Sequence, residues 1–180
     1  MPLHLENLDY ENVRELMLNE FESDVRTGRI FLSNRLKKSA HTTYLDSMKT
    51  AIKSGDDDSC ASQLEMNNCF EEYETKQVKG KLIKSKVPYS ACSTLSEGEF
   101  NRFYLRGICI KAVEEEKEIE IYRAKRVAEA RPDSNQKIGT RRDPATLLAD
   151  LRTNIGANLI EGVPSGPNSG LSGKIVEKRT

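Results

Sequence analysis

The 180-residue chain contains no tryptophan and only two histidines, and aromatic residues make up 6% of it. Its hydrophobic fraction of 37% is enough for one core of ordinary size but not for two independent cores. No apolar run approaches the roughly 20 residues of a membrane-spanning helix. The N-terminus also lacks the basic and then apolar pattern of an export signal. We therefore predict a soluble, single-domain protein that stays inside the cell and has no membrane partner.

Motifs for nucleophilic or cofactor-dependent catalysis are also missing. The chain has no Gly-x-Ser-x-Gly elbow and no phosphate-binding loop followed by Lys-Ser/Thr. A catalytic triad would have to use His41, because the other histidine is His4. The cysteines lie at irregular spacings, at Cys60, Cys69, Cys92 and Cys109. Without CxxC pairs or neighbouring histidines they are expected to be reduced thiols. These absences predict a non-enzymatic protein without metal or cofactor.

One arrangement of charged residues leaves an enzymatic alternative open. Asp58, followed by Glu74 and Lys76, has the residue types of a metal-dependent nuclease, in which carboxylates hold Mg²⁺ and a lysine stabilises developing charge. The Glu-x-Lys spacing is common by chance in a chain with 31% charged residues. Asp58 also ends an acidic triplet, residues 56–58, that suits the positive end of a helix dipole. A nuclease is therefore the weaker hypothesis.

Charge is unevenly distributed although the formal net charge is zero. Residues 1–75 contain 15 acidic and 8 basic side chains, whereas residues 76–180 contain 13 acidic and 20 basic ones. Such a distribution favours contacts between copies of the chain, or an anionic partner on the basic half. In the simpler interpretation both halves share one domain, and their charges interleave on its surface.

Hydrophobic periodicity predicts an α+β fold with four or five helices. Four helices are expected at residues 9–27, 40–53, 56–66 and 97–116. The first should be capped by Asp9, and the fourth by a capping box of Ser96 and Glu99. A short last helix should follow Asp143 and Pro144, which suit the N-cap and the first helical position.

The strands are expected to form a small, mainly antiparallel sheet. Residues 69–87 have the pattern of a hairpin around Gly80, and residues 118–123 alternate polar and apolar side chains. Residues 123–142 are basic and irregular, which predicts a loop. Residues 156–180 are rich in Gly, Pro, Ser and Asn and are expected to form an extended tail. The predicted organisation is one α+β domain over residues 1–155, followed by this tail.

The candidate binding residues are basic or aromatic. Those on the predicted helix 97–116 are Arg102, Tyr104 and Arg106, and those around the basic loop are Arg123, Lys125, Arg126, Arg131, Arg141 and Arg142. Arginine and tyrosine carry many protein interfaces. Clustered cations also bind phosphates by releasing counterions, and Tyr104 or Tyr122 could stack on bases. Both partners stay open, and so does internal pairing of the arginines, but the lack of a basic excess favours protein over nucleic acid.

Five short stretches of sequence together resemble an uncharacterised family of small conserved proteins associated with tailed phages and prophages. They are residues 97–107, 121–125, 131–134, 147–153 and 166–172, so the resemblance spans nearly the whole chain. It implies no activity and no catalytic residues. It implies either a virion component, such as a head-associated or cement-like subunit, or a small host-takeover protein.

The residues and this resemblance together predict a non-enzymatic, virion-associated assembly protein. It would occur in the host cytoplasm and then in the virion, in contact with copies of itself or with a capsid protein. Residues Gly162–Leu171 would act as an arm along the partner. The alternative is a nucleic-acid-binding phage protein, with a metal-dependent nuclease as its enzymatic form.

Overall fold

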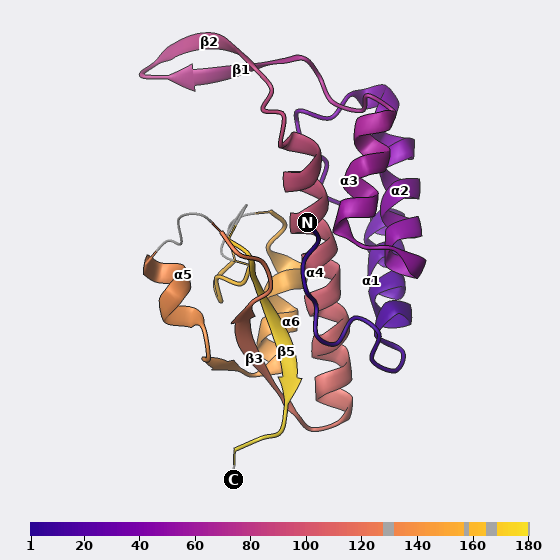
Figure 1. Ribbon diagram of the computed structural model, residues 1–180, viewed down its shortest axis with the longest axis vertical. Coiled ribbons are helices and arrows are strands. Elements are labelled where there is room, and N and C mark those ends of the chain that lie inside the picture. Colours follow the sequence, from indigo (N-terminus) through magenta and orange to yellow (C-terminus); the bar gives the residue numbers. More distant parts are fainter. Residues whose placement is uncertain (128–131, 157–158, 165–168, 180) are drawn as a thin grey trace.

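The computed structural model describes residues 1–127, 132–156, 159–164 and 169–179. Over these residues the chain forms one α+β domain with six α-helices and two small sheets (Figure 1). The helices are α1 (Val13–Thr27), α2 (His41–Ser54), α3 (Asp57–Met66), α4 (Ala91–Glu114), α5 (Pro132–Lys137) and α6 (Pro144–Thr153), with a 3-10 turn at Lys38–Ala40. The strands are β1 (Tyr73–Val78), β2 (Lys81–Lys86), β3 (Glu118–Arg123), β4 (Arg141–Arg142) and β5 (Leu171–Val176). The predicted fold class is thereby confirmed.

Helix α4 is the central element, with α1, α2 and α3 on one side and β3, β5 and α6 on the other (Figure 1). Phe21 of α1 meets Phe103 of α4 edge to face, with ring centroids 5.3 Å apart. At Gly107 the two helices approach so closely that a Cβ would lie 2.9 Å from Cγ of Met17. Because α4 is covered on both sides, apolar side chains are needed nearly all around it.

Two predicted helix starts were wrong. Helix α4 begins at Ala91, so Ser96 lies buried inside the helix and does not cap it. Helix α1 begins at Val13, and the carboxylate of Asp9 instead accepts a hydrogen bond from Nε of Arg14 at 2.9 Å. The cap of α6 is as predicted, because Asp143 accepts from the Thr146 N–H at 2.8 Å; the acidic triplet 56–58 lies at the start of α3 as predicted, and its first member, Asp56, caps that helix by accepting from the Ser59 N–H at 2.8 Å. Their residue ranges are therefore close to the predicted ones.

The three-stranded antiparallel sheet has the order β4-β3-β5 and packs against α4. Its outer strands correct two predictions. The basic segment 123–142 is not all loop, because it includes α5 and β4. The segment 156–180 is not a detached tail, because β5 pairs with β3 over six residue pairs. Leu171, Ser172 and Gly173 are buried there, so the end of the chain belongs to the core.

The proposed arm Gly162–Leu171 lies against its own domain where it is described. Val163 is fully buried, and Nζ of Lys137 donates to the carbonyl of Gly162 at 2.9 Å. Residues 165–168 are outside the described residues. Among the described helices, none combines the length and apolar character needed to cross a bilayer.

The N-terminal segment joins the helices to the sheet. The N–H of Leu3 donates to Oδ1 of Asp57 at 2.9 Å, and the N–H of His4 donates to the carbonyl of Ala124 at 2.8 Å. The N–H of Asn7 donates to the hydroxyl of Tyr104 at 3.1 Å. Asp57 is only 3% exposed, and burial is the main reason why the pKa of its carboxyl rises from 3.8 to about 6. Its ionisation is therefore unfavourable in the folded protein.

Replacing Asp57 by Asn should make the protein more stable at neutral pH. The folded-state pKa lies above the unfolded one, so wild-type stability falls as Asp57 ionises between about pH 4 and pH 6. Asn keeps an acceptor for the Leu3 N–H and cannot ionise. We expect equal unfolding free energies at pH 4 and a gain on the order of 2 kcal/mol at pH 7. Urea unfolding from pH 4 to 7 measures this, and a pH-independent difference would contradict it.

Candidate interaction surface

The three helix residues predicted to bind a partner lie inside the protein. The side chains of Arg102 and Arg106 are 2% exposed, and Tyr104 is fully buried. The prediction of an exposed interface at these residues is therefore wrong. Tyr104 instead joins two parts of the domain, because its hydroxyl donates to the carbonyl of Gly173 at 3.1 Å and accepts from the Asn7 N–H.

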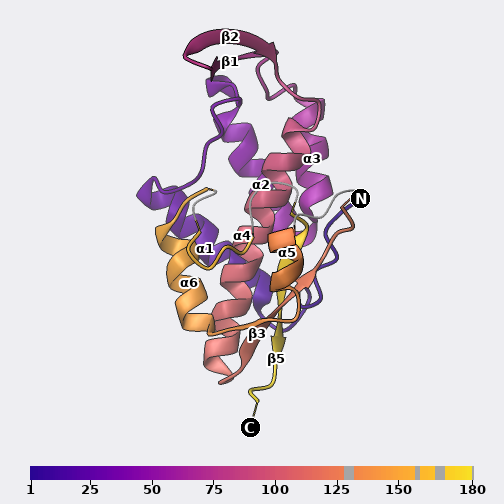
Figure 2. The same cartoon turned by 90° about the vertical axis from the view of Figure 1, so that its left-hand side faces the viewer.

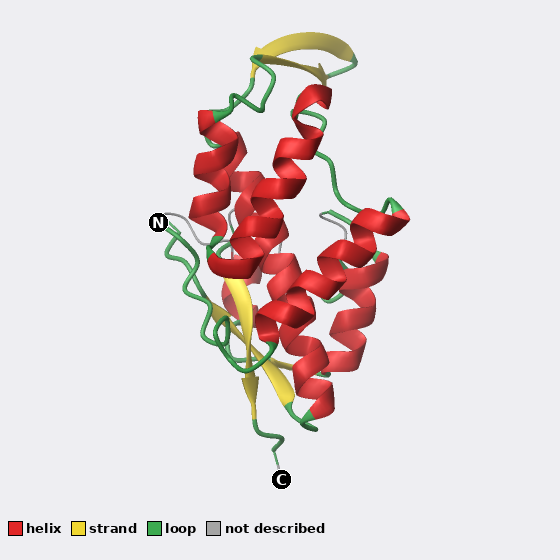
Figure 3. Ribbon diagram, turned by 90° about the vertical axis from the view of Figure 1, so that its right-hand side faces the viewer, coloured by secondary structure: helices red, strands yellow, loops and turns green. Residues whose placement is uncertain are grey.

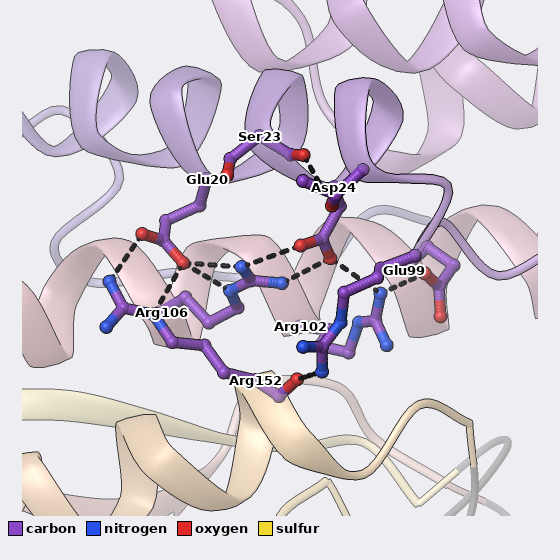
Figure 4. Close-up of polar contacts among 9 residues, drawn as sticks. Glu20, Ser23, Asp24, Glu99, Arg102, Arg106 and Arg152 are labelled. Atoms are coloured by element: carbon purple, nitrogen blue, oxygen red, sulfur yellow. Dashed lines mark hydrogen bonds and ion pairs between the residues drawn. The ribbon is translucent and has the colours of Figure 1, made fainter.

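The two arginines belong to an ionic cluster between α1, α4 and α6 that is buried except for its member on α6, Arg152 (Figure 4). Its members are Glu20, Asp24, Glu99, Arg102, Arg106 and Arg152. Nε of Arg106 donates to Glu20 at 2.7 Å, and its Nη1 donates to Asp24 at 2.6 Å. Nη2 of Arg152 donates to Glu20 at 2.6 Å. Three carboxylates balance three guanidinium groups, so the cluster holds the helices together without excess charge.

The pKa shifts within the cluster follow from burial and pairing. Burial favours the neutral form of Glu20, but Arg152 and Arg106 outweigh it and keep the pKa of that carboxyl below its usual value. Burial raises the pKa of Glu99 to about 7, and Arg102 offsets this only in part. The arginines therefore stabilise the charged form of Glu20 more than they stabilise the charged form of Glu99.

Most cations of the basic loop are also paired within the chain. Arg123 donates to the carbonyl of Ser169 at 2.8 Å, and Lys125 donates to Glu97 at 2.7 Å. The remaining pairs are Arg141 with Glu118 at 2.9 Å and Arg142 with Glu161 at 3.1 Å. Arg126 is exposed, and Arg131 lies outside the described residues. Four of these six side chains therefore hold segments of the chain itself, and the described ones are not gathered into one free basic surface.

The residues of the nuclease alternative do not form a common site. Asp58 pairs with the N-terminal amine at 2.8 Å, while Glu74 pairs with Arg35 and with Lys76, each at 2.7 Å. Within the part of the chain that the structure describes, no three His, Cys, Asp or Glu side chains are grouped to hold a metal ion. These carboxylates therefore have structural partners.

The most exposed regular element is the β1-β2 hairpin, which extends beyond the helices at one end of the molecule (Figures 1, 2 and 3). Its strands pair in register from Tyr73↔Lys86 to Val78↔Lys81. Lys79 and Gly80 close the turn with φ of 49° and 78°, which suits a two-residue hairpin loop. The two strands pair only with each other among the described strands. Both outer edges of the hairpin are therefore open.

This hairpin carries both positive charge and exposed apolar side chains. Residues 73–86 contain five lysines and one glutamate, so the rest of the chain has a net charge of −4. Large apolar side chains are exposed on its strands (Tyr73, Val78, Leu82 and Ile83) and at its base (Met66 and Tyr89). Leu82 is 77% exposed and Tyr89 91%. The register places Tyr73 and Leu82 on one face of the hairpin and Val78 and Ile83 on the other, so each face presents two apolar side chains. Grouped apolar side chains mark an interaction surface more often than a single exposed residue does.

A groove of about 560 Å³ lies at the base of the hairpin. Its apolar lining includes Leu64, Cys69, Phe70, Val87, Pro88 and Cys92, and its charged lining is Glu65, Glu71, Glu72, Lys37 and Lys86. The hydroxyl of Tyr89 donates to Glu65 at 2.7 Å at its border. We call the groove and the hairpin together the hairpin end (residues 64–92).

Sequence reasoning predicted the hairpin but did not place any candidate binding residue on it. The signal was present, because residues 76–96 contain five lysines and no acidic residue. No protein-family model, curated protein or solved structure matches the chain.

Proposed function

We propose that this protein is a non-enzymatic assembly subunit that binds another protein through the hairpin end. The observation that carries the proposal is an exposed two-stranded hairpin with apolar side chains on it and a groove at its base. A hairpin without a third strand or a helix against it is marginally stable in water. A partner that covers it would stabilise it. The resemblance to phage-associated proteins makes a phage particle the setting of this assembly.

The energetics favour a protein partner with an apolar contact. Complete burial of one leucine or isoleucine side chain contributes about 1.5–3 kcal/mol. Leu82 and Ile83 are 77% and 47% exposed, so most of that gain is still available for Leu82 and less than half of it for Ile83. The groove adds a concave apolar surface beside them. Tyr73 on the hairpin and Tyr89 at its base add the side-chain type that anchors many protein interfaces.

The five lysines favour nucleic acid as a second candidate. A two-stranded ribbon fits the major groove of a DNA duplex, and lysines release counterions from phosphates. However, Glu65, Glu71 and Glu72 at the base would face the same polyanion and repel it. We therefore place protein assembly before nucleic-acid binding.

Photo-cross-linking tests this function. Leu82 is replaced by the photo-reactive p-benzoylphenylalanine, and the control carries the same group at Thr50, an exposed position on α2. After irradiation of the purified protein and of cells that make it, adducts are separated by mass and identified. We expect protein–protein adducts from position 82 and few from position 50. Adducts of position 82 with nucleic acid alone would contradict the proposed function.

A further inference from the structure

We propose that the partner of the hairpin end is a second copy of this chain, and that two copies exchange hairpins around a two-fold axis. Each hairpin tip would lie in the groove at the base of the other hairpin. This inference rests on the proposed function and names its partner.

The charges of the hairpin end are complementary to themselves in this arrangement. The tip carries Lys79 and Lys81, which have no ion pair among the described residues, whereas the groove carries Glu65, Glu71 and Glu72. Two hairpins that lie antiparallel place each basic tip against the other copy's acidic groove, so the favourable contact occurs twice. Lys37 and Lys86 also line the groove. Lys37 donates to the carbonyl of Asn68 at 2.7 Å and keeps its charge, so Lys37 and Lys86 offset two of the three glutamates and leave the groove lining with a net charge of −1.

The apolar side chains are complementary in the same way. Val78 and Leu82 are exposed near the tip, and Leu64, Phe70 and Val87 line the groove. Each strand has six residues, so tip and base lie about 20 Å apart. The strands pair in register over this whole length, which keeps a tip away from its own groove. The groove can therefore receive a tip only from another molecule.

The open edges of the hairpin also allow it to pair with the hairpin of a second copy. Antiparallel pairing of one edge strand with its copy is compatible with a two-fold axis, and it would convert two marginal hairpins into a four-stranded sheet. Such a contact uses the same patch on both copies and closes at two chains. The expected product is a dimer.

Reciprocal charge reversal tests this dimer. The tip variant carries Lys79→Glu and Lys81→Glu, and the groove variant carries Glu71→Lys and Glu72→Lys. Each variant alone brings like charges together at both contacts, so its dimer dissociation constant should rise at least tenfold. In a mixture of the two variants both contacts join opposite charges again. Size exclusion with light scattering should give twice the 20.3 kDa chain mass for the wild type and for the mixture.

Matched controls separate this effect from general charge or folding effects. Lys53→Glu with Lys178→Glu makes the same charge change at two exposed positions outside the hairpin end, and this variant should remain dimeric. Thermal melts should show that the tip and groove variants are folded. The inference is overturned if the wild type is monomeric at all concentrations, or if the mixture stays monomeric. If Leu82 then cross-links to a different protein, the proposed function stands with another partner. If it cross-links to nucleic acid alone, both proposals fail.

Discussion

A chain that ends at Gly170 is expected to lose its cooperative fold. The missing residues include β5, which pairs with β3 over six residue pairs. Without β5, the buried side chain of Asn101 loses its contacts with the Leu171 carbonyl and the Ser172 hydroxyl, and Tyr104 loses the Gly173 carbonyl. Each orphaned buried polar group costs about 1–3 kcal/mol. The apolar side chains of α4 and β3 also become exposed, and this costs a comparable amount of free energy. The sum reaches the 5–15 kcal/mol that stabilises a typical domain.

Thermal unfolding followed by near-UV and far-UV circular dichroism measures this effect. The matched control ends at Val176, which keeps β5 and removes the exposed Glu177, Lys178 and Arg179 together with Thr180, which lies outside the described residues. Its main lost contacts are the exposed pair of Lys117 with Glu177 and the Arg141 contact to the Glu177 carbonyl. We expect this control to melt within a few degrees of the full chain. A cooperative transition of the shorter chain at the same temperature would show that β5 is dispensable.

The elements that sequence reasoning predicted correctly are those with local signals. Asp56 before α3 and Asp143 before α6 mark helix starts within a few residues of chain, and the alternation of residues 118–123 marks β3. Strand β5 has no such signal. Its sequence begins Leu171-Ser172-Gly173, and its stability comes from a strand about 50 residues earlier. A glycine inside a strand normally weakens that strand. Here Gly173 lets β5 approach α4, since a Cβ would lie 3.0 Å from Leu105.

The buried cluster was missed for a related reason. Arginines one turn apart on a helix are usually solvated, so Arg102 and Arg106 favoured a surface interpretation. The helix α1 carries a matching acidic pair, Glu20 and Asp24, with the same spacing of four residues. Two helices with opposite pairs at equal spacing can form a charge ladder when they pack side by side. Only the packing of α1 on α4 decides between this ladder and two exposed surfaces.

A substitution of Arg106 by Met is expected to destabilise the protein by about 3–5 kcal/mol at pH 7. Methionine fills most of the space of the arginine stem but leaves the buried carboxylates of Glu20 and Asp24 without their shared cation. The control is Arg152→Met, which removes another partner of Glu20 from a side chain that is 47% exposed. An exposed pair contributes little, so we expect a loss of about 1 kcal/mol for that variant. Urea unfolding at equilibrium measures both.

The pH dependence of the Arg106→Met deficit identifies its cause. In the wild type the cluster keeps the pKa of Glu20 low, so its contribution is present at neutral pH and is lost as the pH falls through that pKa. In the variant Glu20 keeps only Arg152 as a cationic partner, so the pKa of its carboxyl is higher than in the wild type and protonation relieves the cost of burial as the pH falls. Both effects reduce the deficit, which should shrink to about 1–2 kcal/mol near pH 4. A packing defect alone would give the same deficit at every pH, because an apolar cavity does not titrate.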